Sequence, residues 1–118
     1  MIAYDLDGTI LFSRYNNPIL KKIWFTINPN ICKSDVESII TARTSNWAEI
    51  TWLSCKLLGL NNVSNIIFNP IPRWDLKYIV TWKAKILEDY NFDTYIDNDQ
   101  LICDGIHSLG FRGVIKHV

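Results

Sequence analysis

The sequence has no excess of charge of either sign. Its 12 lysine and arginine residues balance its 12 aspartate and glutamate residues, so the formal net charge is zero. Proteins that bind nucleic acids or membrane surfaces usually carry a basic surface that attracts phosphate groups. The charge balance therefore gives no support to either class of protein.

Cysteine is scarce, and its spacing argues against two kinds of site. The three cysteines show no Cys-x-x-Cys spacing and no paired histidine cluster, so we expect neither a disulfide framework nor a zinc site. We expect small buried side chains in a reducing compartment at Cys32, Cys55 and Cys103. The sequence also lacks a charged-then-apolar leader before its first acidic motif, and any apolar run near the ~18 residues of a membrane span. These absences predict a cytoplasmic protein without a membrane partner.

What the sequence does contain is enough apolar side chains for a core. Hydrophobic residues make up 48% and aromatic residues 13% of the 118 residues. A chain of this length forms one compact core more readily than two, so we expect a single domain over residues 1–118. The tryptophans are expected mostly in the core or between helices: Trp24, Trp47, Trp52, Trp74 and Trp82. For Trp74, in a proline-rich loop, stacking on a base is the alternative.

Short segments rich in Ile, Val or Tyr predict five strands. They cover Met1–Tyr4, Val36–Thr41, Val63–Asn69, Asp93–Asp97 and Gly113–Val118. Between them we predict helices over Asn46–Leu58, Thr81–Asp89 and Gln100–Leu109, a further helix over Pro18–Phe25, and a turn at Asn28–Asn30. No repeat or low-complexity segment interrupts this alternation of strands and helices.

Two of these helices need comment. In the helix over Asn46–Leu58, one face at helical spacing carries Trp47, Ile50, Leu53, Leu57 and Leu58. The start of the helix over Thr81–Asp89 is open. Residues Lys77–Val80 are either its first turn, with Asp75 as the cap, or a separate extended piece.

The alternation predicts an α/β fold with a three-layer, Rossmann-like arrangement: an open parallel sheet of about five strands with helices on both faces. Ligands of such sheets bind beyond the carboxyl ends of the strands. Polar residues that could take part in catalysis or binding follow three of these predicted strands. They are Asp5 and Asp7, then Thr41 and Arg43, then Asp97, Asn98 and Asp99.

The motif Asp5-Leu6-Asp7-Gly8-Thr9 follows the first apolar strand directly. It resembles the first motif of the haloacid dehalogenase (HAD-like) superfamily of phosphatases. If each of its four fixed positions matched by chance at ~1 in 20, a chain of this length would contain the motif roughly once in a thousand tries. The resemblance implies a phosphatase of this superfamily, of a small type. Only 31 residues separate Thr9 from Thr41, too few for a large cap domain.

The two carboxylates of the motif have separable expected roles. A carboxylate is a competent nucleophile toward phosphorus, and Asp5 would form an aspartyl-phosphate that splits hydrolysis into two steps. Asp7, brought to the same pocket because Gly8 allows the strand to end, would protonate the leaving oxygen and then deprotonate water, which typically contributes ~10²–10⁴-fold. Two carboxylates and a phosphate repel one another, so a cation is required, and Mg²⁺ suits all-oxygen ligation.

Other segments resemble the remaining motifs of the superfamily in the same order. Thr41, after an apolar strand, would bind the phosphate, and Lys83 would neutralise the charge of the nucleophile and the phosphoryl group. The resemblance gives the substrate-binding residues as Gly8, Thr9, Ala42 and Arg43, and the candidate metal ligands as Asp5, Asp7, Asp97, Asn98 and Asp99. The stretches around Arg43 and Lys83 are similar to the nucleotidase-like and polynucleotide-phosphatase-like branches.

Several assignments keep an alternative. Lys85 competes with Lys83 as the lysine of the site, and Arg43 either contacts a substrate phosphate or base or pairs with an acid. Where the superfamily often has two consecutive acids, this chain has an Asn between two, so Asn98 could supply a neutral oxygen and Asp99 could cap the next helix. The two histidines, His107 and His117, are expected to be ordinary surface or edge residues.

Three functions follow as hypotheses. The first is a Mg²⁺-dependent phosphomonoester hydrolase acting on a nucleotide or another small phosphate. The second is a phosphatase for DNA or RNA ends, for which an open site leaves room but the charge balance gives no support. The third is a catalytically silent HAD-like or receiver-like domain that binds phosphate or regulates. A homo-oligomer, in which a partner chain covers the open site, is compatible with each.

Overall fold

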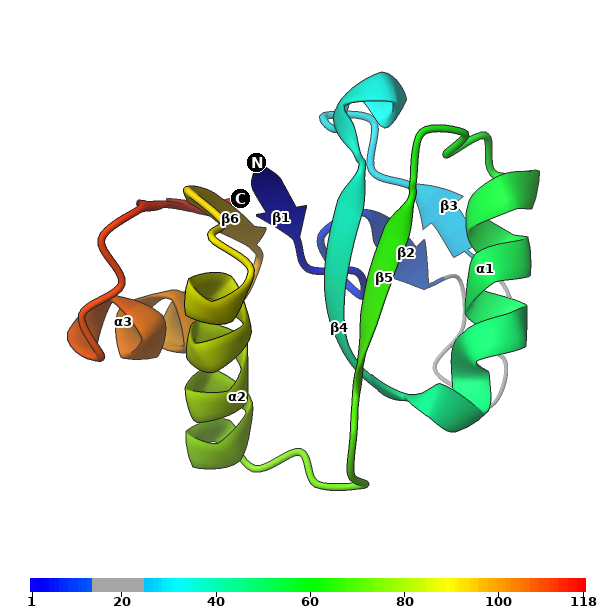
Figure 1. Cartoon of the computed structure of the whole chain (residues 1–118). Helices are drawn as coiled ribbons and strands as arrows, with labels where there is room; N and C mark the ends of the chain where they lie inside the picture. Colours follow the sequence, from blue (N-terminus) through cyan, green and yellow to red (C-terminus); the bar gives the residue numbers. More distant parts are fainter. Residues whose placement is uncertain (14–24) are drawn as a thin grey trace.

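The computed structural model describes residues 1–13 and 25–118. In this part of the chain, five strands form one parallel sheet in the order β5-β4-β1-β6-β7 (Figure 1). The strands are β1 (Ile2–Tyr4), β4 (Ser38–Thr44), β5 (Asn65–Asn69), β6 (Thr94–Asp97) and β7 (Val114–His117). All five predicted strands are therefore present. Strand β4 extends beyond the predicted end, with an irregularity between Thr41 and Thr44.

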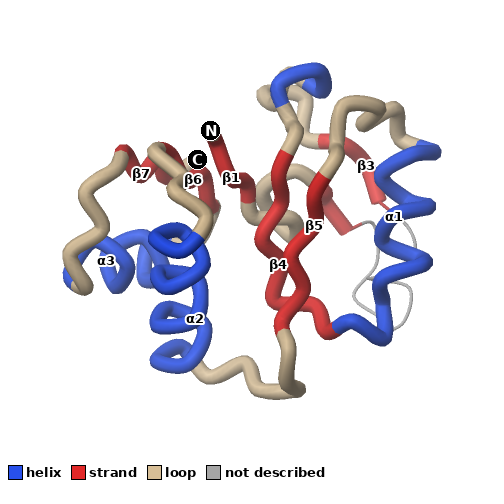
Figure 2. The backbone as a smooth tube through the Cα atoms, viewed as in Figure 1, coloured by secondary structure: helices blue, strands red, loops and turns tan. Residues whose placement is uncertain are grey.

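Among the described residues, three α-helices cover the two faces of this sheet (Figures 1 and 2). Helix α1 (Ala48–Leu57) lies on one face, and helices α2 (Leu76–Asp89) and α3 (Gln100–Ser108) lie on the other. Two short 3₁₀ turns, η2 (Lys33–Asp35) and η3 (Ser45–Trp47), stand in the loops before β4 and α1. The predicted three-layer α/β fold is confirmed, and the described residues form no large cap.

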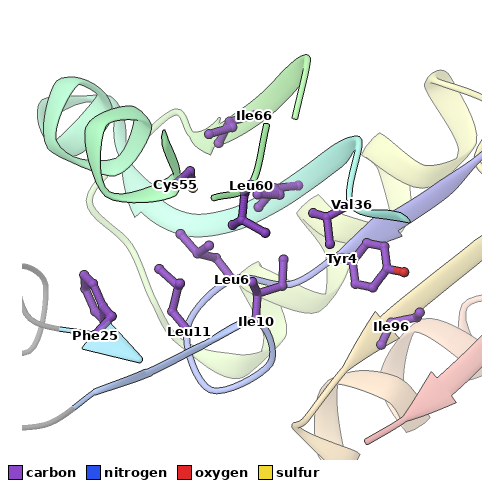
Figure 3. Packing of buried hydrophobic residues seen from close by; sticks show 11 residues of the cluster. Tyr4, Leu6, Ile10, Leu11, Phe25, Val36, Cys55, Leu60, Ile66 and Ile96 are labelled. Atoms are coloured by element: carbon purple, nitrogen blue, oxygen red, sulfur yellow. The ribbon is translucent and has the colours of Figure 1, made fainter. Parts of the chain in front are cut away.

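Alternating side chains of the strands build one core on each face. Tyr4 belongs to the core on the α1 face, together with Cys55 of the helix (Figure 3). Ile39 is part of the same core. Their neighbours Ala3 and Ile40 point to the α2 face. Since successive residues of a strand face opposite sides, a sheet covered on both faces needs apolar residues at consecutive positions, as the sequence provides.

A β-hairpin that the sequence analysis did not predict stands beside the α1 face. Strands β2 (Leu11–Ser13) and β3 (Phe25–Ile27) pair antiparallel. The predicted helix over Pro18–Phe25 lies outside the described residues except for Phe25, which is in β3, so the helical prediction is wrong at that residue. The hairpin is tied to the first motif because Asn28 Nδ2 donates to the carbonyl of Thr9 at 2.9 Å, and the Asn28 N–H donates to the carbonyl of Ile10 at 2.8 Å.

Helix α2 begins earlier than the Thr81 start considered in the sequence analysis. Asp75 caps it, with Oδ2 accepting a hydrogen bond from the Tyr78 N–H at 3.1 Å. Residues 77–80 are therefore helical, as one of the two alternatives stated. The cap satisfies one of the amide donors that the first turn of a helix leaves without an intrahelical partner.

Helix α1 faces the sheet with different residues from those that its apolar spacing indicates. Its buried residues are Thr51, Ser54 and Cys55, whereas Leu57 is 76% exposed and Leu53 is also exposed. The apolar spacing along α1 therefore predicts the wrong face of the helix as the one packed against the sheet. Small side chains face the sheet because a buried arginine, described below, takes up the space and needs a hydroxyl from the helix.

The tryptophans are less buried than expected. Trp47 and Trp82 are half-buried, Trp52 and Trp74 are exposed, and Trp24 lies outside the described residues. Across residues 1–13 and 25–118, no helix is both long and apolar enough to cross a membrane.

Candidate active site

The first motif begins where the central strand β1 ends. The strands that follow β1 in the chain first extend the sheet on one side (β4, β5) and then on the other (β6, β7). This reversal makes the carboxyl ends of β1 and β6 a topological switch point, where open α/β sheets bind ligands. Asp5 stands at the end of β1 and Asp97 at the end of β6. Alternation along the strands directs both side chains to the α2 face.

Asp5 is buried and both of its carboxylate oxygens have partners. Oδ1 accepts a hydrogen bond from the Lys83 ammonium at 2.8 Å, and Oδ2 lies 3.1 Å from the Thr9 hydroxyl. The carboxylate is therefore fixed in orientation by one charged and one neutral donor.

Lys83 reaches Asp5 from the middle of helix α2. Its side chain is only 1% exposed, and it occupies the buried stripe of the helix together with Val80 and Leu87. The stem thus takes a core position, and the ammonium extends to the strand ends. The alternative, Lys85, is exposed and lines a separate hollow of about 870 Å³ that also contains Asp93. The structure brings Lys83, and not Lys85, to the acidic residues.

A buried tyrosine completes this arrangement. Lys83 donates to the Tyr95 hydroxyl oxygen at 2.6 Å, and the Tyr95 hydroxyl donates to Asp97 Oδ2 at 2.5 Å. Lys83 also lies 3.4 Å from the same Asp97 oxygen. We call Asp5, Lys83, Tyr95 and Asp97 the Lys83 cluster. Sequence reasoning missed Tyr95, although a residue two positions before Asp97 on one strand must face the same side, and a buried phenol needs a polar partner.

The Lys83 cluster shifts the ionisation of its members. Burial raises the pKa of Asp5 to about 6, the nearby Lys83 charge opposes this shift, and Asp97 adds to it. Burial works to lower the pKa of Lys83, but Asp5 and Asp97 outweigh it and the pKa is raised above its usual value. Burial is also the main reason why the pKa of Tyr95 lies well above its usual value. At neutral pH the cluster therefore holds a charged ammonium and a neutral phenol.

Asp7 belongs to a second group on the opposite face. Its two oxygens accept hydrogen bonds from Arg43, from Nε at 2.9 Å and from Nη2 at 2.7 Å. Arg43 also donates from Nη1 to the Thr51 hydroxyl of α1 at 3.0 Å, and its guanidinium lies 4.9 Å from the centre of the Phe25 ring. We call Asp7, Arg43, Thr51 and Phe25 the Arg43 cluster. Of the alternatives for Arg43, the structure shows pairing with an acid.

Gly8 and Thr9 connect the first motif to the loop after β6. Gly8 has a φ of +82°, and a Cβ atom there would stand 2.6 Å from Asn98 Nδ2, so both its conformation and its surroundings demand glycine. The Thr9 hydroxyl lies 3.2 Å from Asn98 Oδ1 and accepts from the Asn98 N–H at 3.0 Å. Thr9 is thus a hydrogen-bonding link between Asp5 and Asn98.

The segment after Thr41 is held from two sides. The buried Thr41 hydroxyl accepts from the Arg43 N–H at 3.1 Å. The carbonyl of Ala42 accepts from Asn69 Nδ2 at 3.2 Å and from the Trp74 indole N–H at 2.9 Å. Thr41 and Ala42 therefore lie in the carboxyl-terminal half of β4, the strand next to β1, in the segment for which the sequence analysis expects phosphate contacts.

The candidate metal ligands divide into two sets. The carboxylate of Asp7 is occupied by Arg43, and Asp99 Oδ1 caps helix α3 by accepting from the N–H groups of Leu101 at 2.9 Å and Ile102 at 3.4 Å. Among the described residues, no three His, Cys, Asp or Glu side chains form a group that could hold a metal.

The remaining donors are Asp5, Asp97 and Asn98. Lys83 contacts both of these carboxylates, and the Thr9 hydroxyl contacts both Asp5 and the Asn98 amide oxygen. Two carboxylates and one neutral oxygen suit Mg²⁺, which keeps several water ligands. These three side chains match Mg²⁺ in donor type. Asp97 already accepts at Oδ1 from the Asp99 N–H at 3.0 Å and at Oδ2 from the Tyr95 hydroxyl, so a bound ion would have to share these oxygens.

His117 also lies at this edge of the sheet. Its Nε2 is 2.9 Å from the carbonyl oxygen of Asn98, because β7 places His117 beside Asp97. Sequence reasoning treated it as an ordinary edge residue. Its pairing partner in the sheet, not a local motif, brings it next to the loop.

Comparison with known proteins adds no assignment to this geometry. No protein-family model matches the chain, and neither a curated protein nor a solved structure matches it. Any function for the site has to be argued from its own residues.

Proposed function

We propose that the protein is a HAD-like, Mg²⁺-dependent phosphomonoester hydrolase that acts through an aspartyl-phosphate on Asp5. The observation that carries the proposal is the Lys83 cluster, in which a buried carboxylate at the end of β1 is held by an ammonium and a hydroxyl. Its substrate would be a nucleotide or another small phosphate. The three free cysteines agree with a reducing compartment such as the cytoplasm.

The reaction would proceed in two displacements. An oxygen of Asp5 attacks phosphorus, and the bond from phosphorus to the ester oxygen breaks as that oxygen takes a proton from Asp7. Water then attacks the aspartyl-phosphate while Asp7 takes back a proton, which releases phosphate and restores the Asp5 carboxylate. Lys83 neutralises part of the charge that gathers on the phosphoryl oxygens, as such reactions require.

The surroundings of Asp5 and Asp7 support the different roles proposed for them. Asp5 is buried and held in place, as a nucleophile in a fixed line of attack needs to be. The side chain of Asp7 is 49% exposed, so it has room to turn from Arg43 toward an ester oxygen or a water molecule. Arg43, at 3% exposure, would act on Asp7 and not on the substrate.

Mg²⁺, when bound by Asp5, Asp97 and Asn98, would supply positive charge that offsets the repulsion between the carboxylates and the phosphate. The Asn98 amide would carry no charge of its own, so the two carboxylates set the charge of the site. Thr41 and Ala42 would contact the phosphate from the neighbouring strand.

The test is phosphate release from a panel of phosphorylated metabolites, nucleotides included, with Mg²⁺ present. We expect Asp5→Asn to fold and to lose roughly 10⁶-fold in turnover, that is, all detectable activity. Asp7→Asn should lose ~10²–10⁴-fold. Chelation of Mg²⁺ should stop turnover, and its return should restore it. Undiminished activity of the Asp5→Asn variant would exclude Asp5 as the nucleophile.

A second candidate, a domain that keeps its phosphoryl group as a signal, is favoured by one observation. Both oxygens of Asp7 are occupied by Arg43, and in this position Asp7 is not free to activate water. A phosphoryl donor such as acetyl phosphate would separate the two candidates. Accumulation of phospho-Asp5 without phosphate release would support the signalling domain, and continuous release would support the hydrolase.

A further inference from the structure

The loop that joins β5 to α2, residues 70–75, is fixed by one buried amide. Asn69 donates from Nδ2 to the carbonyls of Ala42 at 3.2 Å and Arg73 at 2.9 Å. Its Oδ1 accepts from the Ile71 N–H at 3.3 Å and from the Tyr78 hydroxyl at 3.0 Å. A buried amide with both its donor and its acceptor satisfied gives the loop a defined shape.

Trp74 stands in this loop with its polar atom bound and its ring exposed. The indole N–H donates to the carbonyl of Ala42 at 2.9 Å, whereas the residue as a whole is 57% exposed. On each side of it in the chain, Arg73 and Asp75 form an ion pair at 2.6 Å, and Arg73 also lies over the Tyr78 ring at 5.1 Å. The ring is thus oriented before any ligand arrives, which reduces the entropy lost on binding.

The position of the ring relative to Asp5 follows from the sheet. Tyr4 pairs with Ile39, so Asp5 is level with Ile40, and Ala42, whose carbonyl accepts from the indole, lies two residues further along β4. Strand β4 neighbours β1, and β5 is the next strand outward. Because neighbouring strands are ~4.8 Å apart and each residue of a strand rises ~3.3 Å, the Ala42 carbonyl that holds the indole lies about 8 Å from the backbone of Asp5. A nucleoside monophosphate covers such a distance between its phosphate and its base.

From these observations we propose that Trp74 stacks on the base of a nucleoside 5′-monophosphate whose phosphate lies at Asp5. The inference rests on the proposed function for the place of the phosphate, and it adds the substrate class. An aromatic ring recognises the flat face that all bases share, so we expect every base to bind, and the larger purines to bind more tightly than pyrimidines.

The experiment measures ligand binding by calorimetry to the Asp5→Asn variant, which leaves the ligand intact. The ligands are adenosine 5′-monophosphate and ribose 5-phosphate, which lacks the base. A further Trp74→Ala change should weaken binding of the nucleotide roughly 5- to 150-fold and leave that of ribose 5-phosphate unchanged. Trp74→Phe should keep most of the nucleotide affinity, because it keeps a ring for stacking. Trp52→Ala, at an exposed tryptophan of α1, is the matched control and should change neither affinity.

The outcomes also separate this inference from the proposed function. If the wild-type protein releases no phosphate but binds the nucleotide in a Trp74-dependent way, the hydrolase is excluded and the base site stands. If it hydrolyses phosphates, yet Trp74→Ala leaves the ratio of kcat/KM for the nucleotide to that for ribose 5-phosphate unchanged, the base site is overturned. Equal weakening of both ligands, or no binding of the nucleotide, overturns it as well.

Discussion

The Lys83 cluster and the Arg43 cluster each hold one carboxylate of the same motif, but on opposite faces of the sheet and in different surroundings. In the Lys83 cluster, a buried ammonium lies between two buried carboxylates and a buried phenol. In the Arg43 cluster, a buried guanidinium holds a carboxylate that is half exposed to water. The first arrangement removes charges from water on every side, whereas the second leaves one partner hydrated.

The two clusters show how two carboxylates of one short motif come to lie in different surroundings. Asp5 and Asp7 are two positions apart, so a continuing strand would point both to the same face. Because β1 ends at Tyr4, the chain leaves the direction of the strand before Asp7, and each carboxylate meets a different cation. A fixed, buried acid and a half-exposed acid are the surroundings that the proposed nucleophile and the proposed proton carrier would need.

The largest expected effect comes from breaking the Lys83 cluster. Lys83→Met leaves Asp5 and Asp97 buried without their cation, and we expect a loss of about 3–5 kcal/mol in the free energy of unfolding. The matched control is Lys85→Met on the exposed side of the same helix, which should stay within about 0.5 kcal/mol of the wild type. Urea denaturation measures both. Similar small losses in the two variants would show that the ammonium is not needed to offset the buried carboxylates.

A smaller effect is expected from the Arg43 cluster. Arg43→Met keeps an apolar stem under Phe25 but removes the hydrogen bonds to Asp7 and Thr51. Asp7 can take up water in place of the guanidinium, so the loss should be about 1–2 kcal/mol, below that of Lys83→Met. The same denaturation series measures it. A loss equal to or larger than that of Lys83→Met would contradict the contrast between a buried and a hydrated carboxylate.

A third effect concerns thiol reactivity and not stability, and it reports on both faces of the sheet. Burial raises the pKa of Cys55, on the α1 face, and of Cys103, on the α2 face, to about 11 each. Alkylation needs the thiolate, so at pH 8 both should react at least ~10²-fold more slowly than an ordinary thiol, and faster as the pH rises toward 11. The exposed Cys32 is the internal control, and mass spectrometry after timed iodoacetamide treatment measures each site.

The same measurement sharpens the comparison when it is applied to the variants. Loss of the Lys83 charge alone would raise the pKa of Cys103, and loss of the Arg43 charge that of Cys55, and both reactions would slow. We expect the opposite, a faster reaction of Cys103 in Lys83→Met and of Cys55 in Arg43→Met, because each change loosens its own face. Equal acceleration of both thiols in either variant would mean that the two clusters open together.

The elements of the sheet could be predicted from local pattern alone, because each strand is a short apolar run between turn residues. The position of Lys83 in the site depended on where α2 begins, and Asp75 settles this by capping the helix six residues before Thr81. The β2–β3 hairpin and the packed face of α1 could not be predicted. Phe25 and Thr51 both contact Arg43, which lies on a different strand or helix from each of them, and the apolar periodicity within one element does not reveal such a contact.

The site was predicted best where residue type and strand end coincide, as for Asp5 and Asp97. The prediction was poorest where a side chain's hydrogen-bond partners determine whether it can bind a metal. Asp7 and Asp99 carry the chemistry of metal ligands, yet one is taken by Arg43 and the other by the first turn of α3. Tyr95 was missed because an isolated tyrosine in a strand is an ordinary core residue until a lysine from α2 is placed beside it.

The mid-helix position of Lys83 also bears on the order in which the chain folds. An ammonium that enters the core alone would lose its water without compensation, so α2 gains from docking only after β1 and β6 have brought Asp5 and Asp97 side by side. These carboxylates are far apart in the sequence, and such distant pairings form slowly. Helix α2 is therefore expected to join late on the folding pathway and to be among the first elements to detach when the protein unfolds.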